Sequence, residues 1–185
     1  MAERDVAVLV GSLRKGSFTR LAAKAAMGLA PPSLSPSLVE IRDLPLYDQD
    51  LDERPPGEWR VFRDRIRRAD AVLFFTPEYN RSVPGVLKNA IDVGSRPYGS
   101  SVWEGKPAGV VSVSPGAMGA FGANHHLRQS LVFLNMPAMA QPEAYLGGAA
   151  DLFDGDGALK SESTREFLSK YLAAFERWAA LHARR

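Results

Sequence analysis

Three runs of mostly apolar residues along the chain predict buried β-strands. They are Val6–Val10, Ala71–Thr76 and Ala108–Val113, each of five or six residues and each followed by glycine, proline or serine. Strands that are apolar on both faces are typical of the centre of a parallel sheet. The runs Leu38–Ile41 and Ala138–Gln141 are shorter, and we expect them to be strands at or near the sheet edges.

Between these runs, apolar residues recur every three or four positions, which predicts helices. The stripes lie in Leu21–Leu29, Trp59–Ala69, Val86–Val93, Leu127–Leu134 and Phe167–Trp178. Alternating strands and helices predict an α/β fold with a parallel sheet covered by helices on both faces. Five such units favour a flavodoxin-like three-layer sandwich with strand order 2-1-3-4-5, formed by one domain over residues 1–185, rather than a six-strand dinucleotide fold or an eight-unit barrel.

Three loops follow the central strands in this topology, at the sheet edge where ligands bind. The first, Gly11–Thr19, joins a buried strand to a helix start, whose unpaired N–H groups favour an anion. Ser12, Ser17 and Thr19 add hydroxyl donors, and Arg14 adds a positive charge, so we expect a phosphate cradle. The alternative is that Ser17 or Thr19 only caps the helix.

The glycine spacing of this loop matches the nucleotide phosphate loop, but Ser17 stands where that motif requires lysine. ATP and GTP hydrolysis are therefore disfavoured. The dinucleotide fingerprint with three glycines is also missing after the first strand. A mononucleotide phosphate fits better.

The second loop, Thr76–Gly85, offers a flat aromatic ring in Tyr79, an amide in Asn80 and a backbone stiffened by prolines. These features suit a planar heteroaromatic ring, and a ring beside a phosphate indicates a flavin. We also expect Ser82 to cap the helix that begins at Pro84. The third loop, Ser112–Gly122, is rich in glycine, so its backbone can approach a ligand closely.

Three motifs carry a resemblance to a known family: Gly11-Ser12-x-Arg14-x-x-Ser17, Pro77-Glu78-Tyr79-Asn80, and Pro84-Gly85-x-Leu87-Lys88-Asn89-Ala90-Ile91-Asp92. In this order they resemble the NADPH-dependent FMN reductase family, in particular its bacterial quinone and chromate reductase branch. The resemblance covers most of the chain. It implies a flavodoxin-like fold, one non-covalent FMN, NADPH or NADH as co-substrate, and a homodimer or homotetramer.

The resemblance also implies roles for residues. The FMN phosphate is expected to contact Ser12, Arg14, Ser17, Phe18 and Thr19, and the isoalloxazine is expected to lie beside Pro77, Glu78, Tyr79 and Asn80, with Ser114 and Gly116 in the third loop. The family takes hydride from NAD(P)H onto flavin N5 and passes electrons to a quinone, free flavin or another small oxidant such as chromate. Because the cofactor carries this chemistry, no catalytic side chain is required.

Two other functions on the same fold are alternatives. A flavodoxin-type electron carrier binds FMN but shuttles electrons between proteins, and such carriers are usually strongly acidic and lack Arg14. This chain has 23 basic and 21 acidic residues, a net charge of +2, which speaks against a carrier. A phosphate-ester hydrolase would need a nucleophile, and cysteine is absent.

Composition excludes several further classes. Without cysteine there are no disulfides, thiolate zinc sites or thiolate-bound iron–sulfur clusters. His125 and His126 are adjacent and point about 100° apart on a helix, so no metal site is expected. Arginines 60, 63, 65, 67 and 68 alternate with acidic residues, which indicates a solvated helix face rather than a nucleic-acid surface. Asp154–Gly157 fails the calcium-loop spacing and is expected to be a turn.

No membrane or export segment is expected, because only five apolar residues follow the charged start and no run approaches the roughly 18 residues of a membrane span. We therefore expect a cytoplasmic protein. Tyr98, Trp103 and Phe121 are predicted to lie near the ligand end of the sheet as exposed aromatics that complete a subunit interface.

Overall fold

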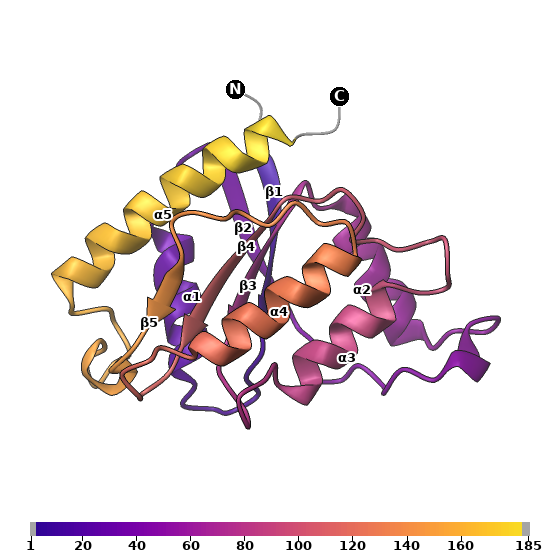
Figure 1. Ribbon diagram of the computed structural model, residues 1–185, viewed down its shortest axis with the longest axis horizontal. Coiled ribbons are helices and arrows are strands. Elements are labelled where there is room, and N and C mark those ends of the chain that lie inside the picture. Colours follow the sequence, from indigo (N-terminus) through magenta and orange to yellow (C-terminus); the bar gives the residue numbers. More distant parts are fainter. Residues whose placement is uncertain (1–2, 183–185) are drawn as a thin grey trace.

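A parallel sheet runs through the middle of the computed structural model, which describes residues 3–182 (Figure 1). Its strands are β1 (Arg4–Val10), β2 (Leu34–Val39), β3 (Ala71–Thr76), β4 (Ala108–Val113) and β5 (Ala144–Leu146). They pair in the order β2-β1-β3-β4-β5, every pair parallel. This confirms the predicted flavodoxin-like order.

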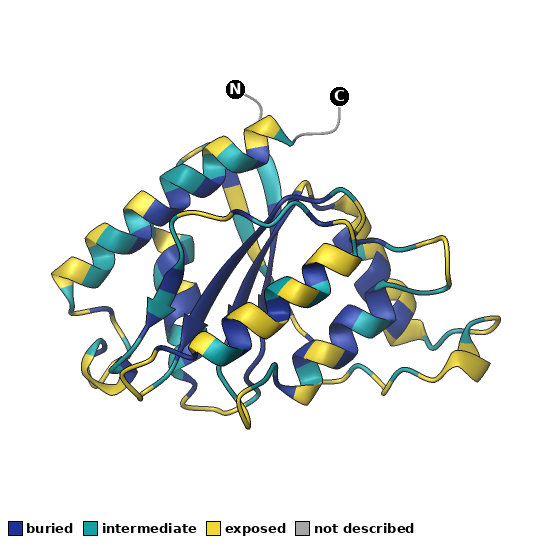
Figure 2. Ribbon diagram, in the orientation of Figure 1, coloured by how far each residue is buried: buried dark blue, intermediate teal, exposed yellow. Residues whose placement is uncertain are grey.

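The two faces of the sheet are covered by different helices. Helices α1 (Phe18–Gly28) and α5 (Glu162–Leu181) pack on one face, against a core that includes Val8 and Phe75. Helices α2 (Gly57–Arg68), α3 (Gly85–Gly94) and α4 (Phe121–Phe133) pack on the other, against Leu9 and Phe74. Figure 2 shows β3 and β4 buried along their whole length between the layers. The continuous apolar runs arise because every second residue faces one core and its neighbour faces the other.

The predicted strand Ala138–Gln141 is wrong in its position. Ala138 makes a single bridge to Ala108 at the start of β4, and the strand itself is Ala144–Leu146, which pairs with the second half of β4. Pro142 lies between the two pieces and has no N–H to donate to a ladder, so the edge is interrupted there. The other predicted edge strand lies earlier than expected, at Leu34–Val39.

The solvated face predicted for α2 holds in part. Arg63 is buried, and burial lowers the pKa of its guanidinium. Arg65 reaches the start of β1, where its guanidinium donates to both carboxylate oxygens of Asp5 at 2.9 and 2.7 Å. Helix α2 is therefore tied to the sheet by one of these arginines and buries another.

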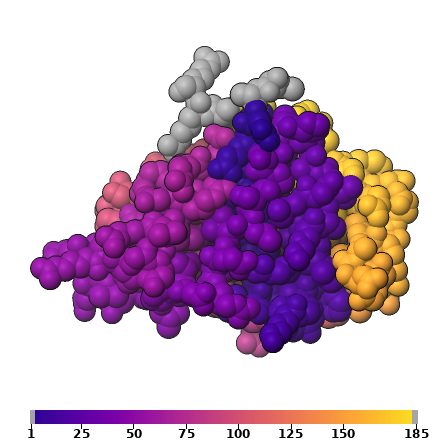
Figure 3. Space-filling view, turned by 180° about the vertical axis from the view of Figure 1, so that it is seen from behind, coloured from indigo at the N-terminus to yellow at the C-terminus, as the bar shows by residue number. Residues whose placement is uncertain are grey.

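The connection from β2 to α2 contains the short 3-10 helix η1 (Gln49–Leu51) and projects from the body of the molecule (Figure 3). Its base is fixed, because the Tyr47 N–H donates to the Asn89 carboxamide at 2.8 Å and the Trp59 indole N–H donates to the Pro45 carbonyl at 2.9 Å. A second 3-10 helix, η2 (Ala149–Asp151), follows β5. None of the helices within residues 3–182 is both long and apolar enough to cross a membrane.

The prediction for Tyr98 and Trp103 is wrong. Both lie in the segment from the end of α3 to the start of β4, at the opposite end of the sheet from the three loops. Trp103 is fully buried, with its indole N–H donating to the Ile91 carbonyl at 2.9 Å, whereas Tyr98 is 90% exposed. Phe121 begins α4, beside the third loop, and is exposed as predicted.

Candidate functional site

The three loops meet around one cavity of about 220 Å³ at the carboxyl end of the sheet. Its lining consists of Ser12, Arg14, Ser17, Phe18, Thr19, Pro77, Glu78, Tyr79, Val113, Ser114 and Pro115. The structure thus brings together every residue predicted for the site except Asn80 and Gly116. Val113 and Pro115 were missed, although they flank Ser114 and any residue at a strand end is a candidate for the lining.

The start of α1 offers several hydrogen-bond donors to this cavity. Ser17 caps the helix, since its hydroxyl accepts from the Arg20 N–H at 3.1 Å. The backbone N–H groups of Phe18 and Thr19 have no acceptor among the described residues. The hydroxyls of Ser12 and Thr19 also lack a partner in this part of the chain, although the two residues are only 5% and 3% exposed.

Because Ser12 and Thr19 line the cavity, these hydroxyls are available to a ligand that binds there. Their position at a helix N-terminus favours a negatively charged ligand. The structure therefore provides an observation, independent of motif spacing, that fits a phosphate group. The residues present suit the phosphate of FMN.

Arg14 is exposed but is held in place. Its guanidinium donates to the Gly16 carbonyl at 2.6 Å and lies over the Phe18 ring, 5.3 Å from the centroid. Phe18 in turn stacks on Phe153 at 6.4 Å. Arg42, which sequence reasoning missed, donates to the Leu13 carbonyl and adds a second cation to the loop. No sequence motif marks Arg42, because it comes close to the first loop only when the segment after β2 is folded.

The first and second loops are in close contact at Gly11. A Cβ atom there would lie 3.1 Å from Leu87 Cδ2 and 3.2 Å from Pro77 Cδ. Those distances are tighter than ordinary van der Waals contact, so glycine lets β1 end directly against the start of α3. The Gly11–Thr19 loop and the Pro77–Asn80 segment are thereby held side by side.

The second loop contains a two-residue hairpin turn. The N–H groups of Tyr79 and Ser82 each donate to the carbonyl of the other, at 3.1 and 3.0 Å, and the central residues Asn80 and Arg81 have φ of 51° and 64°. Two left-handed residues define a type I′ turn, for which asparagine is well suited. Asn80 is exposed outside the cavity lining and serves the turn, while Tyr79 lies 51% exposed on the cavity wall.

The prediction that Ser82 caps α3 is wrong. The residue before α3 is Pro84, which makes no side-chain cap. The Ser82 hydroxyl instead lies 2.7 Å from Nδ1 of His126, on α4. His125 turns to a different partner, with Nε2 2.9 Å from the Tyr145 hydroxyl, and within the described chain no three potential metal ligands come together.

Glu78 directs its carboxylate away from solvent and toward α4. The side chain is 14% exposed, Oε2 accepts from the Ala123 N–H at 3.0 Å, and Oε1 accepts from the Arg81 guanidinium at 3.1 Å. Both oxygens are therefore already hydrogen-bonded within the chain. We therefore expect Glu78 to contact a ligand in the cavity through atoms other than its carboxylate oxygens.

The third loop is fixed from below by a buried polar network. The Ser112 hydroxyl donates to the Gly119 carbonyl at 2.7 Å and accepts from the Asn124 carboxamide at 3.2 Å. Gly119 has φ of 57° and packs against the Tyr145 backbone. The Gly116 N–H donates to the Ser114 hydroxyl at 3.1 Å, and Gly116 lies outside the lining.

One group beside this loop has a strongly shifted pKa. Burial, followed by the neighbouring Glu143 carboxylate, raises the pKa of Tyr145 to about 12. The phenolic oxygen lies 2.9 Å from Nε2 of His125, so the two side chains form a pair beside this loop. Nothing in the sequence pattern marked this pair.

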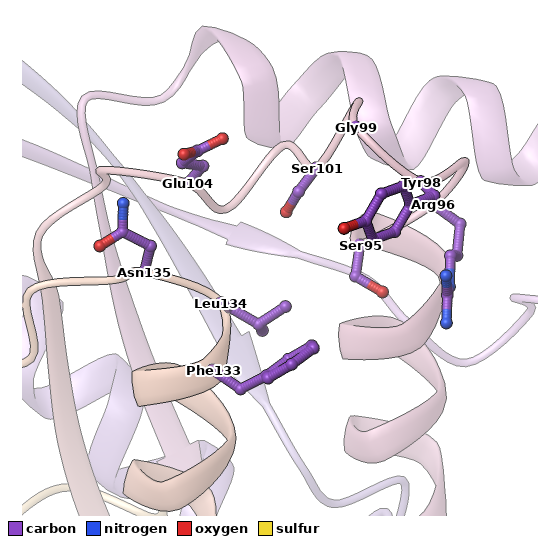
Figure 4. Close-up of a pocket in the computed structure, with 9 residues that line it drawn as sticks. All are labelled: Ser95, Arg96, Tyr98, Gly99, Ser101, Glu104, Phe133, Leu134 and Asn135. Atoms are coloured by element: carbon purple, nitrogen blue, oxygen red, sulfur yellow. The ribbon is translucent and has the colours of Figure 1, made fainter.

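A larger cavity of about 410 Å³ lies at the other end of the molecule, where α3 and α4 end (Figure 4). Its lining is Ser95, Arg96, Tyr98, Gly99, Ser101, Glu104, Phe133, Leu134 and Asn135. Figure 4 shows Glu104 and Asn135 on one side and Tyr98 with Arg96 on the other. Helix C-termini present carbonyl oxygens and disfavour anions, so this cavity suits a phosphate less well than the smaller one.

Comparison with known proteins gives a family match and similarities over nearly the whole chain. The family model described as NADPH-dependent FMN reductase matches residues 4–151. The chain is 64% identical over 179 residues to a quinone reductase of Pseudomonas putida, covering 96% of each, and 44% identical over 178 residues to an NAD(P)H-dependent FMN reductase of Pseudomonas aeruginosa, covering 94% of this chain and 95% of that one. A solved flavoenzyme from Paracoccus denitrificans, an NAD(P)H:(acceptor) oxidoreductase, superposes with a TM-score of 0.92 at 43% identity and covers 98% of this chain and 100% of its own.

Proposed function

This chain belongs to the NADPH-dependent FMN reductase family, and we propose that it binds FMN in the 220 Å³ cavity and uses NAD(P)H to reduce quinones. The similarity to a quinone reductase over nearly the whole of both chains supports the acceptor class. Free flavin and chromate are further candidate oxidants. The proposal applies to the chain as one FMN-binding domain, and a cytoplasmic location remains a prediction.

The observation that carries the proposal is the set of donors at the start of α1. The free N–H groups of Phe18 and Thr19, together with the hydroxyls of Ser12 and Thr19, surround a position suited to a phosphate. Arg14 supplies the charge and is already oriented by Phe18. A dianionic phosphate monoester satisfies donors that the chain itself leaves unpaired.

The other loops provide the surroundings of a planar ring. Pro77 and Tyr79 form one wall, and Ser114 with Pro115 forms another. When bound, FMN would supply the redox chemistry, taking electrons from NAD(P)H and giving them to the oxidant. The chain binds and orients the group, and no protein acid or base is assigned.

We also propose that the protein is a homodimer or homotetramer. Phe133 and Val132 at the end of α4 are 88% and 77% exposed, and Phe133 lines the cavity of Figure 4 together with Tyr98. Exposed apolar side chains of this size, gathered at one end of the molecule, are typical of a subunit interface. Sedimentation equilibrium at micromolar protein measures the assembly directly.

The decisive experiment is spectroscopic. The purified protein is denatured and the released cofactor is identified by chromatography, and FMN rather than FAD is expected. Anaerobic addition of NADPH or NADH should then bleach the flavin absorption, and a quinone should restore it. An electron carrier of the flavodoxin type would bind FMN but would not be reduced by either nucleotide alone.

A further inference from the structure

Helix α4 begins without a capping side chain of its own. The residue before its first turn is Ala120, which has φ of 63° and no side-chain oxygen. The first N–H groups of a helix need partners from outside the helix, which serine, threonine, aspartate or asparagine usually supplies. Here the partner comes from a different loop.

Glu78 supplies that partner. Its Oε2 accepts from the Ala123 N–H at 3.0 Å, in the first turn of α4, and its carboxylate lies where the helix dipole favours negative charge. A Cβ atom at Gly122 would lie 2.9 Å from Oε2 and 3.2 Å from the Arg81 carbonyl oxygen, so glycine at this position permits the close approach of the hairpin.

A second bond ties the other end of the same hairpin to α4. Ser82 Oγ lies 2.7 Å from His126 Nδ1, one turn further along the helix. Helix α4 also holds the third loop, because Asn124 donates to Ser112 and Ser112 donates to Gly119. The first two turns of α4 therefore hold the second and third of the loops that face the cavity.

We propose that Glu78 is a positioning residue for flavin binding, which holds the Pro77–Asn80 segment against α4 through its carboxylate rather than by contact of that carboxylate with the flavin. The inference rests on the proposed FMN site and adds to it an assignment of what this side chain does. It predicts that the acceptor oxygen at Ala123 matters more than the negative charge, since Arg81 is largely exposed and its ion pair is screened by solvent.

The test is an FMN titration of the apoprotein, followed by flavin fluorescence. Glu78→Ala should weaken FMN binding by about tenfold, because the loosened hairpin must then be ordered when FMN binds. Glu78→Gln keeps an acceptor oxygen and should bind FMN within about threefold of the wild type. It should also restore the visible circular dichroism of the bound flavin, which reports its surroundings.

A matched control is Ser161→Ala, which removes the side-chain cap of α5 outside the cavity lining. It should lower thermal stability and leave FMN affinity unchanged. Equal losses of affinity in Ser161→Ala and Glu78→Ala would overturn the inference, because the effect would then follow general stability. So would unchanged affinity in Glu78→Ala, or a Glu78→Gln variant as weak as Glu78→Ala.

Hydrogen exchange in the wild-type apoprotein provides a second measurement, useful where Glu78→Ala does not fold. The Ala123 amide should be protected before any FMN is added, because the contact belongs to the protein itself. Exchange of that amide at an unprotected rate would refute the positioning role. A wild-type protein that binds no FMN would instead refute the proposed function, with the exchange result still reporting on Glu78.

Discussion

At the carboxyl end of the sheet the hydroxyls of Ser12 and Thr19 line the cavity and have no hydrogen-bond partner in the described chain, whereas at the amino end Lys106 and Trp103 donate to backbone carbonyls. The Lys106 ammonium there donates to the carbonyls of Arg67 and Ala69 at 3.1 and 2.6 Å. The Trp103 indole N–H donates to Ile91. Beside these two, Arg4 Nη1 and His182 Nε2 are buried without a partner in the described chain, so the contrast concerns the hydroxyls that face the cavity and not every polar group of either end.

From this difference we expect the polar groups at the amino end to serve stability and the unpaired hydroxyls at the carboxyl end to serve ligand binding. A donor that lines a cavity and has no acceptor in the chain is available to a ligand, whereas a buried donor bonded to a carbonyl stabilises the fold. Substitutions at the amino end should therefore change unfolding free energy, and substitutions at the carboxyl end should change ligand affinity. Each prediction below tests that division.

The largest effect is expected at Gly94, the last residue of α3. A Cβ atom there would lie 2.4 Å from Trp103 Nε1 and 2.5 Å from Cε2, against a fully buried ring. Gly94→Ala should lower the free energy of unfolding by about 3 kcal/mol, a typical cost of overpacking. Urea denaturation measures this loss, while FMN affinity of the folded protein should change little.

Gly28→Ala is the matched control, since Gly28 ends α1 in the same way and a Cβ there would meet nothing within 4 Å. It should leave stability unchanged or raise it by up to about 1 kcal/mol. If Gly94→Ala were as stable as Gly28→Ala, the amino end would not be tightly packed and the comparison would fail.

The packing at Gly94 also shows which part of the fold sequence reasoning reaches. The strands β1, β3 and β4 were predicted correctly because burial on both faces leaves a continuous apolar run. Burial of Trp103 could not be predicted, because it depends on the space left by a glycine nine residues earlier in a different element. β5 was misplaced because a three-residue edge strand carries too little pattern to distinguish it from the apolar Ala138–Gln141 run.

The candidate site was more predictable than the amino end. Helix N-termini and strand ends are local features, so the first loop and most of the second could be assigned from motif and resemblance. The hydrogen bonds of Glu78, Ser82 and Asn124 to partners on α4 and beneath the third loop could not, because they join segments more than ten residues apart. The pairing of Tyr145 with His125 has the same origin.

At the carboxyl end the largest effect is expected from Arg14. Arg14→Ala should weaken FMN binding about tenfold or more, since a charge-assisted phosphate contact contributes about 1.5–3 kcal/mol. Stability should hardly change, because the side chain is exposed and makes one hydrogen bond, to Gly16. Lys15→Ala removes a neighbouring exposed cation outside the lining and should leave the affinity within about twofold. Equal losses from both variants would mean that only the net charge of the loop matters.

Thr19 and Ser17 provide a finer test within one helical turn. Thr19→Val removes a hydroxyl without a partner, so FMN affinity should fall about threefold to tenfold while the apoprotein is as stable as the wild type or more so. Ser17→Ala removes the cap that accepts from the Arg20 N–H, so it should also destabilise the apoprotein, by about 1 kcal/mol. Titration and urea denaturation of both variants measure the two effects. A Thr19→Val variant that loses stability would show that its hydroxyl has a partner within the protein.

The smallest effect is expected at Tyr145, a carboxyl-end group that does have partners. Its pKa is raised from 10.0 to about 12 by burial and by Glu143, so the native state keeps the phenolic proton when the unfolded chain has lost it. The resulting stabilisation is complete below about pH 10 and declines as pH rises toward 12, because the unfolded state then binds fewer protons than the native state. Tyr145→Phe should reduce this loss of stability at high pH by less than about 1 kcal/mol, since the side chain is only partly buried.

Urea denaturation at about pH 9 and about pH 11 measures the difference. The control is Tyr98→Phe, which removes a 90% exposed phenol at the amino end and should match the wild type. Because the Tyr145 hydroxyl is paired with His125, its removal should change stability and leave FMN affinity unchanged. A loss of FMN affinity in Tyr145→Phe would extend the ligand site to α4 and β5. Distance from the cavity, rather than the pairing of each polar group, would then decide whether a substitution changes ligand affinity or stability.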